Sequence, residues 1–375
     1  MDSPQDPFRE SREKEGVHYV EAEGEQVPLI LRHNDVRDVC RDWKTFSSDD
    51  PFMIVLHSEE HLRPVRQLPI ETDPPDQKEY RALIEPLFRR PLKAEYREDM
   101  QALVDDMVRE ATQQDEVEAV GEFSKVLQCR ALTRLLDVNE SEAQVWIGWG
   151  THVFEEGDGS LVDEYVRRKF AEAEGSDGDD FFSVLNRVEF RGRRLTNEEK
   201  YGFASVTFAG GRDTIIHTVS SILVYLAGHP EALPFLREDE SRITTATEEF
   251  VRWVSPLTAI ARKCPHGGEA VEHEVPPDGR VALCWPSANR DEKVFENPDE
   301  VVLDRSPNPH IGYGFGIHHC LGAPHARVII SCLLKSLCKQ VERIELLEAA
   351  PQMEHESSYD RQVGYATARV AFHAM

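Results

Sequence analysis

The apolar residues of this chain recur mostly at helical spacing. Between residues 96 and 136 they fall three or four positions apart, as at Met100, Leu103, Val104, Met107 and Val108, which is the pattern of an amphipathic helix. Short helical pieces separated by acidic, glycine-containing turns are expected between residues 140 and 196, and a last helix from about residue 321 to 341. The pattern predicts a mainly helical protein.

Shorter stretches of alternating apolar residues predict a smaller β portion. They occur within the first sixty residues (as in 26–31), between residues 268 and 284, and in the final thirty residues. No repeat, low-complexity segment or linker rich in Pro, Gly and Ser divides the chain. We therefore expect residues 1–375 to form one helix-rich domain with small β-sheets.

The longest helical pattern has a clear start. Thr196 and Glu199 have the spacing of a capping box, and an apolar run follows them to Leu226. A helix of about 30 residues would be about 45 Å long, long enough to cross the whole molecule. Its interior contains Gly210 and Gly211, each costing roughly 1 kcal/mol relative to alanine. A flat cofactor that lies against the backbone would explain them.

One turn further, Asp213 and Thr214 place a carboxylate beside a hydroxyl. An acid next to an alcohol can relay protons from water to a reacting centre. The alternative is a kinked core helix in which Asp213 forms an ion pair and Thr214 bonds back to a carbonyl of its own helix.

Composition and charge exclude several classes of function. The net charge of −26 argues against non-specific binding to nucleic acid or to anionic membranes. No apolar run approaches the roughly 20 residues that span a bilayer, and the N-terminus lacks the features of a signal peptide. The seven cysteines are scattered singly, which indicates reduced thiols and a cytoplasmic location.

One cysteine stands in a setting suited to a metal ligand. Cys320 follows a loop with glycines at 314 and 316 and precedes an apolar run that begins near Leu321. A thiolate at a helix N-terminus is stabilised by the helix dipole and by unpaired N–H groups, and it can bind a soft metal centre such as haem iron. The alternative is a buried free cysteine after a glycine-rich turn.

The segment 313–322 resembles the haem-ligand loop of the cytochrome P450 superfamily, of the soluble bacterial type. The pattern there is Phe-Gly-x-Gly-x-His-x-Cys-x-Gly, and only the first position differs, because Tyr313 replaces the usual Phe. The resemblance implies that Cys320 binds the iron of haem b. It also assigns Gly210, Gly211, Phe315 and Gly322 to the surroundings of the cofactor.

Other motifs follow in the order of that superfamily. The resemblance assigns Arg81, Arg262 and His318 to the haem propionates, whereas Gln77 stands where a histidine is common, so its role there is open. It implies a structural role for the buried pair formed by Glu249 and Arg252, three residues apart. Asp213 and Thr214 match the pair that delivers protons to the reacting centre.

The resemblance implies a monooxygenase that uses O2 and receives electrons from a ferredoxin with a flavin-dependent reductase, because no reductase domain fits in this length. A local basic cluster, Arg89, Arg90 and Lys93, is the expected docking patch, and a monomer is expected. The alternatives are a peroxide-dependent peroxygenase, a haem-thiolate protein that binds or senses without turnover, and a structural protein without a cofactor.

The substrate is the least determined feature. The resemblance places Val206, Ala209, Gly210, Thr258 and Ile260 at the distal pocket, under a roof made of residues 47–71 and 145–170. The first roof segment is unusually charged and the roof is short. We therefore expect a compact polar or methoxylated substrate, which would be hydroxylated or O-demethylated.

Overall fold

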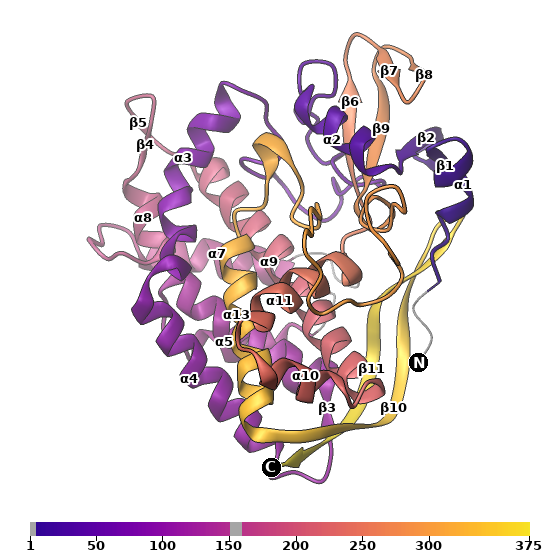
Figure 1. The fold of residues 1–375 in the computed structure, drawn as a ribbon. Helices are drawn as coiled ribbons and strands as arrows, with labels where there is room; N and C mark the ends of the chain where they lie inside the picture. Colours follow the sequence, from indigo (N-terminus) through magenta and orange to yellow (C-terminus); the bar gives the residue numbers. More distant parts are fainter. Residues whose placement is uncertain (1–4, 151–159) are drawn as a thin grey trace.

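The computed structural model describes residues 5–150 and 160–375. Most of its helices lie on one side of the molecule, on the left in Figure 1. Their bounds are α1 (Arg9–Lys14), α2 (His33–Arg41), α3 (Asp76–Phe88), α4 (Ala94–Ala111), α5 (Lys125–Leu136), α6 (Glu142–Gly148), α7 (Ser160–Glu172), α8 (Phe181–Arg187), α9 (Asn197–Gly228), α10 (Ala232–Glu238), α11 (Ser241–Val254), α12 (Trp285–Ala288) and α13 (Ala323–Gln340).

The strands form small sheets, two of which lie on the other side of the molecule (Figure 1). One sheet has the order β1-β2-β9-β6, in which only β2 and β9 run parallel, and another has the order β10-β11-β3. Two hairpins, β4-β5 and β7-β8, complete the set. The bounds are β1 (Val17–Ala22), β2 (Glu25–Ile30), β3 (Val117–Glu118), β4 (Glu189–Phe190), β5 (Arg193–Arg194), β6 (Ala259–Cys264), β7 (Gly268–Ala270), β8 (His273–Val275), β9 (Gly279–Cys284), β10 (Val341–His355) and β11 (Asp360–Ala374).

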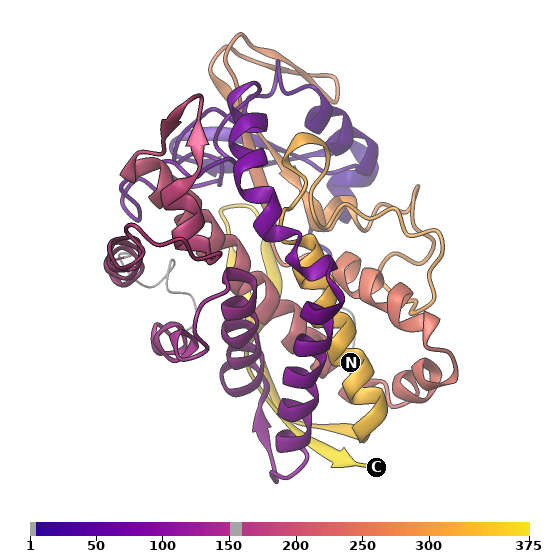
Figure 2. The ribbon, with the colours of Figure 1, turned by 90° about the vertical axis from the view of Figure 1, so that its left-hand side faces the viewer.

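Helix α9 is the central element, and it begins at the predicted capping box. The Thr196 hydroxyl accepts from the Glu199 N–H at 3.2 Å, and the Glu199 carboxylate accepts from the Thr196 N–H at 2.7 Å. The helix has 32 residues, most of them buried in two hydrophobic clusters. Helices α4 and α13 lie side by side in Figures 1 and 2 and share one of these clusters with α9. The hairpin β10-β11 packs along α9 on the other side.

The predicted fold class, mainly α with small β-sheets, is confirmed. The capping-box helix, the helix after Cys320 and the strands at 268–284 and at the C-terminus lie where the pattern placed them. The hairpin β4-β5 was missed, because two-residue strands are too short for an alternating pattern; its turn at Arg191 and Gly192 has positive φ at both residues. Among the described residues no helix is both long enough and apolar enough to cross a bilayer.

Candidate active site

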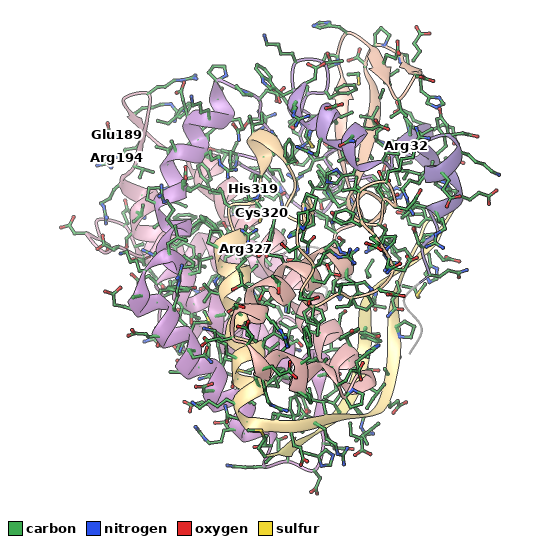
Figure 3. The ribbon with its side chains drawn as sticks, viewed as in Figure 1. Arg32, Glu189, Arg194, His319, Cys320 and Arg327 are labelled. Carbon is green, nitrogen blue, oxygen red and sulfur yellow. The ribbon has the colours of Figure 1, made fainter. Side chains whose placement is uncertain are left out.

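The loop before helix α13 presents Cys320 in a tightly fixed backbone (Figure 3). The Cys320 N–H donates to the Tyr313 carbonyl at 2.8 Å. Gly316 has φ +74°, and a Cβ there would lie 3.0 Å from the Cys40 carbonyl of α2, so a side chain would strain the turn. The turn therefore needs glycine for both its conformation and its close approach to α2.

The Cys320 sulfur faces a space inside the fold. The residue is exposed, yet burial is the main cause that raises its thiol pKa, so the space is enclosed by protein. The N–H groups of Gly322 and Ala323, at the start of α13, oppose that rise, and so do the charges of Arg81 and Arg327. This arrangement suits an anionic sulfur once a metal replaces the thiol proton.

Helix α9 borders an open space at its paired glycines. Among residues 5–150 and 160–375, no heavy atom lies within 4 Å of a Cβ built at Gly210 or Gly211, and Gly210 is exposed although the helix runs through the core. Val206 and Ala209, on the preceding turn, are half-buried. Because interiors are close-packed, open space beside a central helix indicates room for a bound group.

The acid–alcohol pair lies at this space. Asp213 and Thr214 are both half-buried. The Thr214 hydroxyl donates to the Gly210 carbonyl at 2.9 Å, which is the back-bond of the structural alternative, but its oxygen can still accept a hydrogen bond. The Gln128 amide of α5 donates to the Gly211 carbonyl at 2.7 Å. Both glycine carbonyls are thus held by side chains.

Three of the predicted propionate partners, Arg81, Arg262 and His318, lie close enough to one another for their charges to interact. Arg262, on β6, is only 6% exposed, and burial lowers its pKa. Burial, followed by the charges of Arg262 and Arg81, lowers the pKa of His318 to about 3. The His318 Nε2 is buried and has no hydrogen-bond partner in the part of the chain that the structure describes. Buried donors and cations of this kind call for an anion.

The remaining residues assigned to the cofactor support the loop. Gln77 is 2% exposed, and its amide donates to the Ile317 carbonyl at 2.8 Å, so it holds the haem loop in place of the usual histidine. The ring of Phe315 lies against Arg37 and Arg41 of α2, whose guanidinium carbons are 4.6 and 5.0 Å from its centroid. The structure does not show this ring facing the open space.

Glu249 and Arg252 form an ion pair with fully buried side chains. Arg252 donates to Glu249 at 2.8 Å through two nitrogens, and to carbonyls of residues 289, 298 and 300. Glu249 also accepts from Arg305 at 2.9 Å and from the Val302 N–H at 2.8 Å. The pair joins α11 to the segment before the cysteine loop.

A neighbouring network was missed by the sequence analysis. Glu248 accepts from Arg327 of α13 at 2.7 and 2.9 Å and lies 3.0 Å from the His310 ring nitrogen. The Arg327 guanidinium lies 4.5 Å from the centroid of the Tyr313 ring. A signal was present, since Arg327 follows Cys320 by seven residues and lies in the first turns of α13.

The predicted docking patch is only partly available. Arg89 and Lys93 are exposed. The Arg90 side chain is 14% exposed and lies 3.6 Å from Asp137. It donates to the Leu135 carbonyl at 2.7 Å and to the Asp179 carbonyl. The Arg90 charge is thus engaged at the C-terminal end of α5 and at Asp179, and the docking role of the three residues stays a prediction.

The predicted pocket lining divides into two groups. The α9 residues face the open space, as described above. Thr258 and Ile260 share a face of β6 with Arg262 by strand alternation, but they are only 4% and 8% exposed. The Thr258 hydroxyl donates to Glu354 and accepts from Arg361 at 2.8 Å. Their place in the pocket stays a prediction.

The predicted roof is described in part, because residues 151–159 of the second segment lie outside the described residues. In the first segment, Arg63 pairs with Glu71 and Glu59, and Arg66 pairs with Asp49. These charges are satisfied within the loop. Arg63 and Arg66 are therefore not free to bind a polar substrate without breaking these pairs.

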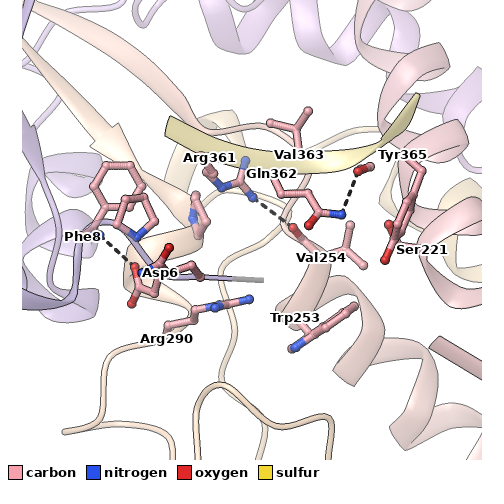
Figure 4. A pocket seen from close by; sticks show the side chains of 14 residues that line it. Asp6, Phe8, Ser221, Trp253, Val254, Arg290, Arg361, Gln362, Val363 and Tyr365 are labelled. Atoms are coloured by element: carbon pink, nitrogen blue, oxygen red, sulfur yellow. Dashed lines mark hydrogen bonds between the residues drawn. The ribbon is translucent and has the colours of Figure 1, made fainter. Parts of the chain in front are cut away.

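A separate small pocket lies near the end of α11 (Figure 4). Asp6, Trp253, Arg290, Arg361 and Gln362 are among its lining residues. None of the residues predicted for the cofactor or the proton relay lines it. We therefore place the chemistry at Cys320 and α9 and not in this pocket.

The residues present fit a haem. Its flat ring would be bordered by the Gly210–Gly211 surface of α9 and by the cysteine loop. Cys320 would be the iron ligand. The cations Arg81 and Arg262, together with the neutral His318 ring, whose Nε2 has no hydrogen-bond partner among the described residues, suit two propionates.

Comparison with known proteins agrees with this geometry. A family model described as Cytochrome P450 matches residues 160–342, which include the α9 motif, the α11 pair and the cysteine loop. The "Polyketide biosynthesis cytochrome P450 PksS" of Bacillus subtilis (strain 168) is 26% identical over 369 residues, covering 92% of this chain and 89% of that protein. A "Steroid C26-monooxygenase" of Mycolicibacterium smegmatis (strain ATCC 700084 / mc(2)155) is 24% identical over 375 residues, covering 94% and 87%.

Solved structures extend the similarity to the whole fold. The structure described as "The structure of a carbohydrate active P450" has a TM-score of 0.97 and 44% sequence identity, with 100% of both chains covered. P450 OxyD, described as involved in the biosynthesis of vancomycin-type antibiotics, has a TM-score of 0.86 at 21% identity over 98% of this chain and 95% of that chain. At that identity the second likeness concerns the fold alone.

Proposed function

This chain belongs to the cytochrome P450 family of haem b monooxygenases, and we propose that it oxidises a small, polar, carbohydrate-like substrate. One observation carries the proposal: the 44% identity over all of both chains to a structure described as a carbohydrate active P450. The other relatives named above are described as acting on different compounds and are only 21–26% identical.

Haem bound through a cysteine thiolate supplies O2 activation, since the thiolate donates electron density that favours O–O cleavage. The residues of this chain would hold and supply that chemistry. Arg81 and Arg262 would neutralise the propionates, and His318 would orient one of them through a hydrogen bond. Asp213 would carry protons in from water, and the Thr214 oxygen, anchored at Gly210, would accept a hydrogen bond beside the open space.

The overall reaction inserts one oxygen atom of O2 into a C–H bond. The other oxygen atom takes up two electrons and two protons and is released as water. On an O–CH3 group the product is a hemiacetal, which breaks its C–O bond to give the free hydroxyl and formaldehyde. We propose that the electrons come from a ferredoxin and its flavin-dependent reductase. Arg89 and Lys93 would contact the acidic partner.

The proposal is tested by titrating the haem-loaded protein with the mono-O-methyl ethers of D-glucose and D-galactose. A substrate that displaces water near the iron shifts the haem spectrum. The affinity follows from how that shift grows with substrate concentration. Turnover with a ferredoxin, its reductase and NADH should release formaldehyde in step with NADH consumed. Preference for steroids or long fatty acids over every sugar would refute the substrate class. The Cys320→Ala variant is the control without an iron ligand.

Peroxide-dependent turnover is the second candidate. The intact Asp213–Thr214 pair argues against it, because a peroxide-driven enzyme needs no proton relay for O2. Formaldehyde released faster with hydrogen peroxide than with NADH and the redox partners would favour the peroxygenase.

A further inference from the structure

Glu248 and Arg327, the α11–α13 pair, join α11 to the helix that follows Cys320. The two side chains are 25% and 40% exposed, and two nitrogens of Arg327 donate to Glu248 at 2.7 and 2.9 Å. Two bonds between planar groups set the orientation of the guanidinium as well as its distance from the carboxylate. The pair is distinct from the propionate partners and from the proton relay.

A histidine supports the pair through a hydrogen bond. The Gly312 N–H donates to His310 Nδ1 at 3.2 Å. In the tautomer that this bond requires, the proton of the ring is on Nε2, which donates to Glu248 at 3.0 Å. His310 then adds no charge, so the pair with its histidine consists of one anion and one cation.

Arg327 also contacts the cysteine loop. Its guanidinium carbon lies 4.5 Å from the centroid of the Tyr313 ring, which is within the range of a cation–π contact. The Tyr313 carbonyl accepts from the Cys320 N–H at 2.8 Å. Tyr313 therefore contacts both the cation and the residue that would bind the iron (Figure 3).

The positive charge of Arg327 acts on the cysteine itself. Burial raises the pKa of the Cys320 thiol, and the charges of Arg81 and Arg327 are among the causes that oppose this rise. A cation that favours negative charge on the sulfur also favours the addition of an electron to an iron bound there. Arg81 is assigned to a propionate, whereas Arg327 is held by Glu248.

We propose that the α11–α13 pair sets the reduction potential of the haem iron, with Arg327 acting through Cys320 as a positioning residue. Arg327 favours the ferrous state, and Glu248 both holds the guanidinium and offsets part of its charge. Removing either partner leaves the other without its counter-charge. The two single variants should therefore shift the potential in opposite directions, which the loss of a purely structural contact would not do.

The test is a spectroelectrochemical titration of the haem-loaded protein, with sodium dithionite as the reductant and one electron taken up per iron. At the wild-type midpoint potential, half of the wild-type haem is reduced. At that potential Arg327→Met should have a ratio of ferrous to ferric haem at least about threefold lower than wild type, and Glu248→Gln a ratio about twofold higher. Arg327→Lys keeps the cation and should lie closer to wild type than Arg327→Met.

Arg242 and Glu238 offer a matched control of the same chemistry. Arg242 donates to Glu238 at 2.7 Å, and its guanidinium carbon lies 3.9 Å from the centroid of the Phe235 ring. Helix α10, which carries Glu238, lies at the other end of α13, where Arg237 donates to the Cys338 carbonyl at 2.9 Å. Cys338 is about 22 Å along α13 from its first residue, at 1.5 Å per residue. Arg242→Met and Glu238→Gln should leave the potential unchanged.

The measurement uses neither substrate nor redox partner. Its result is therefore independent of the substrate proposal and of a docking role for Arg327, and a sugar that fails to bind would not affect it. The proposal is overturned if Arg327→Met does not lower the ratio, or if Glu248→Gln does not raise it, relative to the control variants. If Arg327→Met does not retain haem, the sign of the shift in Glu248→Gln decides.

Discussion

Replacing Glu249 by glutamine is expected to weaken the fold at the segment that leads to the haem loop. The carboxylate is fully buried and faces two guanidinium groups, those of Arg252 and Arg305, whose side chains are 0% and 8% exposed. Glutamine keeps the shape but leaves both cations without a counter-charge. Removing one partner of a buried pair costs about 3–5 kcal/mol, a large part of the roughly 5–15 kcal/mol by which a native protein is stable.

The preceding residue offers a matched control. Burial raises the pKa of Glu248, and the bonds from His310 and Arg327 overcome that rise and lower it to about 2. Its side chain is 25% exposed and that of Arg327 is 40% exposed, so water screens the pair. For Glu248→Gln we expect a loss of about 1–2 kcal/mol, clearly smaller than that of Glu249→Gln.

The assay is urea unfolding of the haem-loaded protein at pH 7, followed by tryptophan fluorescence. It is paired with the fraction of protein that gives the thiolate-type spectrum when the haem has been reduced and CO is then added as a ligand. Glu249→Gln should unfold at a lower urea concentration than Glu248→Gln and lose more of the thiolate signal. Equal losses in the two variants would refute the reasoning from burial.

Three other outcomes are expected. Thr214→Ala should form less product per NADH consumed than wild type and release peroxide instead, because the relay hydroxyl is gone. Thr214→Ser keeps the hydroxyl and should restore most of the product yield. An alanine variant with the wild-type ratio of product to NADH would exclude the relay. Replacing both Arg89 and Lys93 by glutamate should slow reduction by a ferredoxin and make the reduction rate less dependent on salt, with an unchanged melting temperature. Arg90→Glu, in contrast, should lower the melting temperature. The hydrogen bond from Arg193 lowers the pKa of Glu199 to about 2. The ionised carboxylate therefore stabilises the fold above the unfolded-state pKa near 4.3, and this stabilisation is lost as the pH falls toward 2. The difference in unfolding free energy between wild type and Glu199→Gln should narrow between pH 5 and pH 3.

The sequence predicted the features that depend on local pattern. The α9 start followed from Thr196 and Glu199 because a capping box is a contact between residues three apart. The open space beside α9 was inferred from Gly210 and Gly211, since adjacent glycines inside a helix need a reason. These inferences required no knowledge of distant contacts.

The sequence could not predict which charged side chains come into contact in the folded protein. The sequence places Arg90 in a basic cluster, and only the fold shows that its side chain contacts the end of α5. The charges of residues 47–71, Arg63 among them, suggested a polar pocket, yet Arg63 pairs with Glu71 inside the same segment. The φ of +69° at Phe52 could not be read from its residue type, and its N–H donates to Glu71, a residue 19 positions further along the chain.

Two close contacts determine the rotational setting of α9. A Cβ at Gly202 would collide with the Arg66 carbonyl, and a Cβ at Gly364 of β11 would collide with the His217 ring of α9. The acid–alcohol pair lies between these contacts. Inserting or deleting one residue there would turn one end of the helix by about 100° relative to the other, and both contacts could not be kept. Changes of length in this helix are therefore excluded between the two contacts, whereas substitutions on its outer surface are not.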